Sequence, residues 1–426
     1  MLNLMASKMN QTTAESIGTD MIDVDLVRAV KEEVEAARET LVELCAQLVA
    51  AESANPPGNT AQMARTLSAF LTAQGLPART VAADDEAPNI VCTLSADRPG
   101  AHVVFNAHMD TMLAGDLASW TVPTLELTRK DGRLYGLGMG NMKGALAAMA
   151  VAMKVVQRRL PGLTGKLSLT GVSDEVMFGS RGSPFVLQQN SDLYGDYLIS
   201  GEGPGWMNFA VAEKGLLWVD ITATGAAGHS SRALAGQTAV ARMANFLCKL
   251  DQLNDTYAEL PAEIAGIDGG EDGVGLRLSV SVGNLEAGNV RSLIPPVVRA
   301  KADLRLPPGL MIDDLKVRLE EFVQSCEGIG IQYVKGWPAS WAPLDCAPVK
   351  SLAAAAAVVR ETPTRYVVRL PGSDARFWRD RGVTSVCYGP QPTLSSGIDD
   401  YAVEQDVLDC ASIYALTAMR LMRIKH

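Results

Sequence analysis

Carboxylate and imidazole side chains come directly after several apolar runs of this sequence. They are His108, Asp110, Asp174, Glu175 and Glu202, which follow the runs 102–107, 166–172 and 197–200. Apolar runs of this length predict buried strands, and the carboxyl ends of parallel strands meet at one edge of a sheet. We therefore expect these side chains to converge on one cleft. There an imidazole and a carboxylate can bind a divalent metal ion, and a second carboxylate can act as a general base.

The motif His108-Met109-Asp110 has the spacing of an oriented metal ligand. The Asp110 carboxylate can accept the Nδ1 proton of His108 and so turn the other ring nitrogen towards a metal ion. The chain has only four histidines, the others being His102, His229 and His426, which excludes a histidine-rich metal site. His102 opens an apolar run and is expected to be structural.

The elements that must position these residues alternate between helix and strand over the first half of the chain. Helical periodicity predicts one long helix from Leu26 to Leu48. The runs 78–82, 89–93 and 102–107 predict strands, and a helix over 143–156 follows them. This alternation is typical of an α/β fold.

The pattern changes near Phe209. Strands over 216–224, 275–282, 297–306 and 331–335 and helices over 237–250 and 312–326 follow in the ferredoxin-like order β-α-β-β-α-β. We therefore expect an α/β domain, at residues 1–210 and 337–426, with an inserted α+β domain at residues 211–336. Residues 1–22 are expected to form a loose tail.

Composition limits the partners and the location of the protein. The 426 residues carry a net charge of −10, which disfavours a nucleic-acid partner. The longest apolar stretches fall short of the roughly 20 residues that a bilayer-spanning helix needs. The first 25 residues lack the basic and apolar regions of a secretion signal. We expect a cytoplasmic protein that binds a small molecule and neither nucleic acid nor a membrane.

Several motifs in one order identify a resemblance. The sequence is similar to the metallohydrolase family that includes acetylornithine deacetylase, succinyl-diaminopimelate desuccinylase, aminoacylase and carboxypeptidase G. The matching stretches are Asn55–Gly58, His108–Asp110, Gly138–Gly144, Asp174-Glu175, Ser200–Glu202, Gly228–Ser231, Asp303–Arg305 and Gly372–Arg376. The resemblance implies a zinc-peptidase-like catalytic domain with an inserted ferredoxin-like dimerisation domain, and a homo-oligomer that is at least a dimer.

Three positions depart from the family pattern that the resemblance implies. Asn141 stands where the family has a metal-bridging aspartate, and Val176 stands where a second glutamate binds metal. The late histidine is missing from the segment Ser395-Ser396-Gly397-Ile398-Asp399-Asp400-Tyr401. The remaining ligands are His108, Glu202 and the neutral oxygen of Asn141. We therefore predict one loosely held divalent ion per subunit, either Mn, Zn or Co.

A single metal changes which reaction is expected. Amide hydrolysis places negative charge on a carbonyl oxygen, whereas displacement of an amine from a nitro-substituted aromatic ring lets the nitro group accept the charge. The sequence resembles the branch of this family that converts 5-nitroanthranilate to 5-nitrosalicylate and ammonia. Under this resemblance Glu175 is the general base, Asp110 orients His108, and His229 enters from a second subunit.

The carboxylate of such a substrate needs a partner. Arg376 and Arg291 are the candidates, and Tyr401 and Ser373 are further candidates for substrate contact. Two alternatives stay open, namely that Arg376 pairs with a neighbour such as Asp374 and that Tyr401 only packs.

Two other functions stay open. The protein could be a single-metal amidase or deacylase of N-acyl amino acids or dipeptides. It could also be a non-catalytic relative that kept the fold and a carboxylate pocket. The departures at Asn141 and Val176 favour the non-catalytic reading, whereas the retained His108, Glu175 and Glu202 oppose it.

Overall fold

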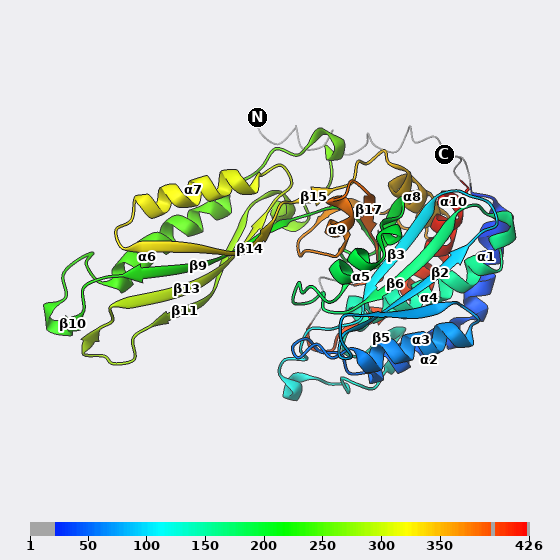
Figure 1. Ribbon diagram of the computed structural model, residues 1–426, viewed down its shortest axis with the longest axis horizontal. Helices are drawn as coiled ribbons and strands as arrows, with labels where there is room; N and C mark the ends of the chain where they lie inside the picture. Colours follow the sequence, from blue (N-terminus) through cyan, green and yellow to red (C-terminus); the bar gives the residue numbers. More distant parts are fainter. Residues whose placement is uncertain (1–21, 393–396, 424–426) are drawn as a thin grey trace.

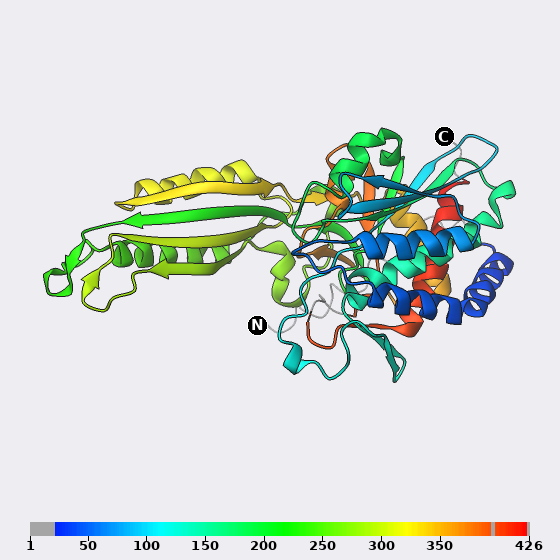
Figure 2. The ribbon, with the colours of Figure 1, turned by 60° about the horizontal axis from the view of Figure 1, so that its bottom comes forward.

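The computed structural model describes residues 22–392 and 397–423, which form a large part and a smaller inserted part (Figure 1). Both views show the inserted part extending away from the large part (Figure 2). The chain passes into the inserted sheet after Glu213 and returns to the large sheet at Ser340. The predicted tail, except for its last residue, lies outside the described residues. Among the described residues, no helix is both long enough and apolar enough to cross a membrane.

The large part is built on a nine-stranded mixed sheet with the order β1-β2-β6-β3-β7-β17-β8-β15, and β16 pairs with β8. Its central strand β3 is buried along its whole length and runs parallel to β6 and β7. The strands are β1 (Ala78–Ala82), β2 (Pro88–Ser95), β3 (His102–His108), β6 (Lys166–Val172), β7 (Tyr197–Ser200), β8 (Phe209–Glu213), β15 (Ser340–Trp341), β16 (Tyr366–Arg369) and β17 (Thr384–Cys387).

Helices cover both faces of this sheet. This agrees with the sequence of β3, which is apolar on both of its faces. Val103 and Phe105 belong to one core cluster and Val104 to another. The first cluster packs under α1 (Val24–Ala36), α2 (Arg38–Ala50), α3 (Ala61–Ala73), α4 (Gly144–Gln157), α8 (Ala347–Val359) and α10 (Glu404–Leu421). The second packs under α5 (Ser183–Gln189) and α9 (Ala375–Arg379).

The predicted helix from Leu26 to Leu48 is wrong as one element, because the chain breaks at Ala37 into α1 and α2. The amide of Ala37 donates to the carbonyl oxygens of both Glu33 and Val34, which tightens the last turn of α1. Tertiary packing explains the break. Both halves pack against α4, but α1 also packs against α10 and α8, whereas α2 also packs against α3.

The inserted part is the predicted β-α-β-β-α-β unit. Its elements are β9 (Gly215–Thr224), α6 (Ala239–Asp251), β11 (Ser279–Ala287), β13 (Val297–Leu306), α7 (Ile312–Gln324) and β14 (Ile329–Trp337). The strands form an antiparallel sheet in the order β11-β13-β9-β14. The expected strand over 275–282 begins later, since the chain first forms a 3-10 helix over Glu271–Leu276.

One face of the inserted sheet packs on α6 and α7, and the other face is open. Along β13, Ala302 and Leu304 are buried in the core under the helices. Asp303 and Arg305 lie on the opposite face. A two-stranded ladder of β10 (Gly228–His229) and β12 (Leu293–Ile294) forms the end of the insert farthest from the large part (Figure 1).

A small three-stranded sheet completes the large part. It contains β4 (Thr128–Lys130), β5 (Arg133–Tyr135) and β18 (Tyr401–Val403) in the order β18-β5-β4. Asp400, just before β18, accepts hydrogen bonds from the amides of Gly138 and Gly140 at 2.8 and 3.2 Å. This contact fixes the loop that carries Asn141.

Candidate active site

The carboxyl ends of the parallel strands β3, β6 and β7 bring the predicted side chains together. His108 is the last residue of β3, Glu175 lies in the loop after β6, and Glu202 lies in the loop after β7. One potential ligand atom from each of these three buried residues lies within 4.8 Å of the other two. The cluster therefore follows from strand order, as the sequence suggested.

The two ring nitrogens of His108 have different surroundings. Nδ1 lies 2.8 Å from the backbone carbonyl oxygen of Asp110 and 3.6 Å from its carboxylate. Nε2 lies 3.8 Å from Glu175 Oε2 and 3.6 Å from Glu202 Oε1. The contact to Nδ1 thus comes from Asp110 through its backbone carbonyl oxygen rather than its carboxylate, and its role in orienting a metal ligand stays a prediction. A proton on Nδ1 that is donated to the carbonyl leaves Nε2 with a lone pair towards the two carboxylates.

The Asp110 carboxylate instead holds the loop of Glu175. It accepts hydrogen bonds from the backbone N–H groups of Glu175 and Val176 at 3.1 and 3.0 Å. The amide of Asn55 donates to it at 2.9 Å. Because these bonds fix the backbone on both sides of the Glu175 Cα atom, Asp110 controls where the Glu175 carboxylate points.

The loop that carries Glu175 is also held by backbone hydrogen bonds within residues 174–179. Asp174 and Phe178 have left-handed backbone angles, with φ of 61° and 51°. The amides of Phe178 and Gly179 donate to the carbonyl oxygens of Glu175 and Asp174 at 2.6 and 2.9 Å. A Cβ atom on Gly179 would lie 1.9 Å from a carboxylate oxygen of Asp174, so only glycine fits. The loop is a tight and locally strained turn.

Arg369 is a site residue that the sequence reasoning missed. Its Nη2 atom donates to Glu202 Oε1 at 2.8 Å, and its Nη1 atom donates to the carbonyl oxygen of Gly372 at 2.6 Å. Both side chains of the ion pair are almost fully buried. The sequence motif Gly372–Arg376 indicated only residues that follow β16, whereas Arg369 is the last residue of that strand.

Gln391 is a second site residue that the sequence did not predict, because it belongs to none of the motifs. Its side-chain amide donates to the oxygen of Asn141 at 3.2 Å and accepts the amide of Gly203 at 2.7 Å. It thereby links the loops of Asn141 and Glu202. The amide oxygen of Asn141, a predicted metal ligand, is therefore already a hydrogen-bond acceptor.

Burial and charge set the protonation of the cluster. Burial raises the pKa of Glu175 well above its usual value, and the charge of Glu202 adds to this effect. Burial also opposes ionisation of Glu202, but the Arg369 charge and the nearby His108 ring outweigh it and lower the pKa of Glu202. Burial disfavours the imidazolium of His108, yet the neighbouring carboxylates of Glu202, Glu175 and Asp110 raise its pKa to about 10.

The donor set fits a divalent metal ion. His108 Nε2 and Glu202 Oε2 are buried and have no hydrogen-bond partner among the described residues. Such orphaned polar atoms cost free energy unless another group satisfies them. An imidazole nitrogen with carboxylate oxygens suits first-row divalent ions. His108 and Glu202 would hold the ion, and Glu175 lies close enough to share it or to act on its water.

A cavity of about 550 Å³ opens onto the cluster. Its polar wall includes Asn141, Glu175, Glu202, Arg369 and Gln391. The apolar wall is formed by Pro56, Met112, Leu113, Val176, Met177, Phe178, Trp218 and Pro371. The site therefore offers a few polar groups beside a mainly apolar surface that contains two aromatic rings.

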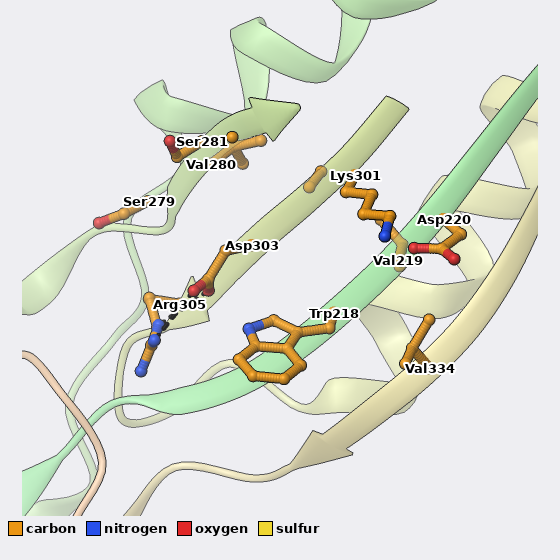
Figure 3. A pocket seen from close by; sticks show the side chains of 12 residues that line it. Trp218, Val219, Asp220, Ser279, Val280, Ser281, Lys301, Asp303, Arg305 and Val334 are labelled. Carbon is orange, nitrogen blue, oxygen red and sulfur yellow. Dashed lines mark hydrogen bonds and ion pairs between the residues drawn. The ribbon is translucent and has the colours of Figure 1, made fainter. Parts of the chain in front are cut away.

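Two cavity residues come from the inserted part. Trp218 on β9 and Arg305 on β13 also line a second cavity of about 710 Å³ on the open face of the inserted sheet (Figure 3). Asp303 accepts hydrogen bonds from Arg305 Nε and Nη2 at 2.8 and 2.9 Å, and the buried Nη1 atom has no partner in residues 22–392 and 397–423. The two cavities thus share a wall.

The other predicted substrate contacts lie outside this lining. The Arg376 guanidinium is stacked 3.9 and 4.0 Å from the ring centroids of Trp337 and Phe377. The hydroxyl of Ser373 is buried and donates to Glu213. Tyr401 packs its ring against Tyr135, with a centroid separation of 5.5 Å. Asp374, the other suggested partner of Arg376, accepts a hydrogen bond from Ser183 at 2.7 Å. Contact of these side chains with a substrate stays a prediction.

His229 and Arg291 lie at the far end of the inserted part. Both are exposed, His229 in β10 and Arg291 in the loop before β12 (Figure 1). The His229 Nδ1 atom lies 2.9 Å from the hydroxyl of Ser231. In one chain these side chains are remote from His108, so their participation requires a second subunit and stays a prediction. Ser395 and Ser396, which occupy the place of the missing histidine, lie outside the described residues.

Comparison with known proteins identifies relatives. A family model described as peptidase family M20/M25/M40 matches residues 104–420. The chain is 32% identical over 191 residues to a probable succinyl-diaminopimelate desuccinylase of Staphylococcus epidermidis. That match covers 44% of this chain and 45% of the relative, so it spans less than half of either protein.

Solved structures share the fold. Human carnosine dipeptidase 1 superposes with a TM-score of 0.71 at 16% identity, covering 94% of this chain and 99% of that chain. The M20 family metallo-carboxypeptidase Sso-CP2 from Sulfolobus solfataricus superposes with a TM-score of 0.71 at 18% identity, covering 90% and 98%. These likenesses confirm the predicted fold class, an α/β domain with a separate small antiparallel sheet.

Proposed function

The chain belongs to the peptidase family M20/M25/M40, and on that basis we propose that it is a metal-dependent hydrolase of a carbon–nitrogen bond. The cluster of His108, Glu175 and Glu202 supports a metal site. The orphaned atoms His108 Nε2 and Glu202 Oε2 support the binding of a cation rather than a purely structural role. A small carboxylate is the proposed class of substrate.

We further propose that the site holds one ion per subunit. Val176 presents an apolar side chain to the cavity where the family resemblance implies a carboxylate ligand. Asn141 is neutral, and its oxygen accepts a hydrogen bond from Gln391. When bound, a Mn, Zn or Co ion would act as a Lewis acid that lowers the pKa of a water molecule and orients the substrate.

The aromatic wall beside the cluster is the observation that carries the choice of substrate. Phe178 and Trp218 line the same cavity as the carboxylates of the cluster, and their ring centroids lie 5.9 Å apart. Such a wall can stack on a flat ring, while Arg369 and Arg305 supply positive charge for a carboxylate or nitro group. We propose 5-nitroanthranilate as the substrate and 5-nitrosalicylate and ammonia as the products.

In the proposed reaction, water attacks the ring carbon that bears the amine. The new C–O bond forms while the ring and its para nitro group accept the negative charge, and the C–N bond then breaks as the charge returns. Glu175 removes a proton from the water and delivers it to the leaving amine. Its raised pKa suits this exchange, because burial makes the carboxylate a stronger base than an exposed glutamate.

Other side chains support this chemistry without exchanging protons. Asp110 fixes the backbone of Glu175 through two amide hydrogen bonds. Arg369 neutralises Glu202 and lines the cavity, and its buried Nε atom has no hydrogen-bond partner within the described part of the chain, which makes it a candidate for the substrate carboxylate. His229 and Arg291 would enter from the tip of a second subunit of a homo-oligomer.

The similarity to a probable succinyl-diaminopimelate desuccinylase favours a second candidate, a single-metal deacylase or amidase. Product analysis separates the two. Metal-supplemented protein is incubated with 5-nitroanthranilate and, separately, with N-acyl amino acids. We expect equal amounts of ammonia and 5-nitrosalicylate, and loss of both in Glu175→Gln but not in Glu32→Gln, which alters an exposed glutamate of α1. Release of free amino acid with no ring product would establish the deacylase instead.

A further inference from the structure

The loop that carries Glu175 belongs to the large part but is also held by a side chain of the inserted part. Lys335, near the end of β14 in the inserted part, donates from Nζ to the backbone carbonyl oxygen of Phe178 at 2.9 Å. Phe178 lies three residues after Glu175, and its amide donates to the Glu175 carbonyl oxygen. The hydrogen bond from Lys335 therefore reaches the same turn that positions the proposed general base.

The backbone of Phe178 needs such a contact. Its φ of 51° lies in the left-handed region, which is unfavourable for a residue with a bulky side chain. Such a conformation persists where surrounding contacts over-determine it, and it is common at functional sites. On the other side of Glu175, the Asp110 carboxylate holds the amides of Glu175 and Val176.

The side chain of Phe178 is also held by the inserted part. Its ring lies 4.9 Å from Trp337 and 5.9 Å from Trp218, measured between centroids. The guanidinium of Arg305 lies 5.9 Å from the same ring. Side chains from β9, β13 and β14 thus all contact Phe178, in the loop that carries Glu175.

A local irregularity in β14 aims Lys335 at this residue. The pairing of β14 with β9 shifts register between Tyr333 and Lys335, which leaves Val334 unpaired. Tyr333 packs towards the core under the helices, whereas Val334 lies beside Trp218 on the open face (Figure 3). A bulge of this kind re-aims the side chain that follows it. The Lys335 ammonium lies 5.7 Å from the centroid of the Trp218 ring.

We propose that Lys335 is a positioning residue, which acts through Phe178 to hold Glu175 in its reactive orientation and so couples the placement of the inserted part to proton transfer. This inference rests on the proposed role of Glu175 as the general base. Removing the Lys335 ammonium would free the Phe178 carbonyl and let the turn relax. A displacement of about 1 Å in a reacting group is enough to lower a rate about 100-fold.

A double-mutant cycle tests the proposal, with Lys335→Met, Glu175→Gln and the double variant. We expect Lys335→Met to lower kcat about 10-fold to 100-fold with little change in KM. In the Glu175→Gln background it should lower the residual rate less than twofold, because the group it positions is already disabled. Lys335→Arg should recover part of kcat. Lys301→Met, which removes an ammonium from the open face of the same sheet, should leave kcat unchanged.

Three results would overturn the proposal. One is an unchanged kcat in Lys335→Met, and another is an equal loss in both backgrounds, which would mean that Lys335 acts independently of Glu175. The third is a loss of bound metal or of thermal stability in Lys335→Met that accounts for the lost rate. If the ring substrate is inert, the cycle is run with an N-acyl amino acid. Failure of the proposed substrate is thereby separated from failure of the positioning role.

Discussion

The ion pair between Arg369 and Glu202 should contribute strongly to the stability of the metal-free protein. Arg369 Nη2 and Glu202 Oε1 lie 2.8 Å apart, and their side chains are 4% and 3% exposed. Replacing Arg369 with methionine would keep much of the side-chain volume but remove the cation nearest to the buried Glu202 carboxylate, which leaves the His108 ring beside it, 3.6 Å away. Removal of one partner from a buried ion pair costs about 3–5 kcal/mol. We expect Arg369→Met to lower the free energy of unfolding of metal-free protein by that amount.

A bound divalent cation should reduce this loss, because it also neutralises Glu202. The assay is urea unfolding of Arg369→Met and wild-type protein, each with and without added Mn. Arg365→Met provides the control, since the ion pair of Arg365 with Asp268 is largely exposed and should contribute less than about 1 kcal/mol. A loss below about 1 kcal/mol in metal-free Arg369→Met, or an equal loss with and without Mn, would refute the reasoning.

Three further predictions concern the fold, the cavity and the subunit contact. Hydrogen bonds from Arg129 and Arg38 hold the pKa of Glu404 below its usual value of 4.5. The ionised Glu404 therefore stabilises the fold fully above pH 4.5, and this stabilisation is lost as the pH falls through the lowered pKa. Glu404→Gln should therefore lower the melting temperature at pH 7, and the difference from the wild type should shrink as the pH falls below 4.5. Trp218→Ala should raise KM for a ring substrate about 10-fold or more by removing the stacking surface, with a smaller effect on kcat, as steady-state kinetics will show. Mixing His229→Ala with Glu175→Gln subunits should restore activity well above that of either variant alone, and mixed dimers with no such gain would exclude a site shared between subunits.

Much of the fold could be predicted because its signals are local. The fully apolar run of β3 and the change of pattern near Phe209 indicated a buried parallel strand and an inserted unit, and both are present. The break at Ala37 could not be predicted, because no proline or glycine marks it. The two halves differ in their tertiary neighbours, among which α10 lies more than 300 residues away from α1 in the sequence.

The candidate site shows the same division between local and distant information. Strand ends placed His108, Glu175 and Glu202 together, since strand order alone fixes which loops meet. Sequence patterns could not show that the Asp110 carboxylate would hold the Glu175 loop rather than His108. Arg369 reaches Glu202 across 167 positions of the chain, and only the folded sheet brings them into contact. Arg376, chosen because it ends a motif, lies instead in a stack of aromatic rings.

Titration of metal-free protein with Mn tests the central claim most directly. Bound metal and the rate of 5-nitrosalicylate formation are measured on the same samples as the ratio of Mn to protein increases. One ion per subunit predicts that the rate rises with bound metal and stops rising at one equivalent. A rate that reaches its maximum only at two bound equivalents, or a fully loaded protein that forms no ring product, would contradict the account.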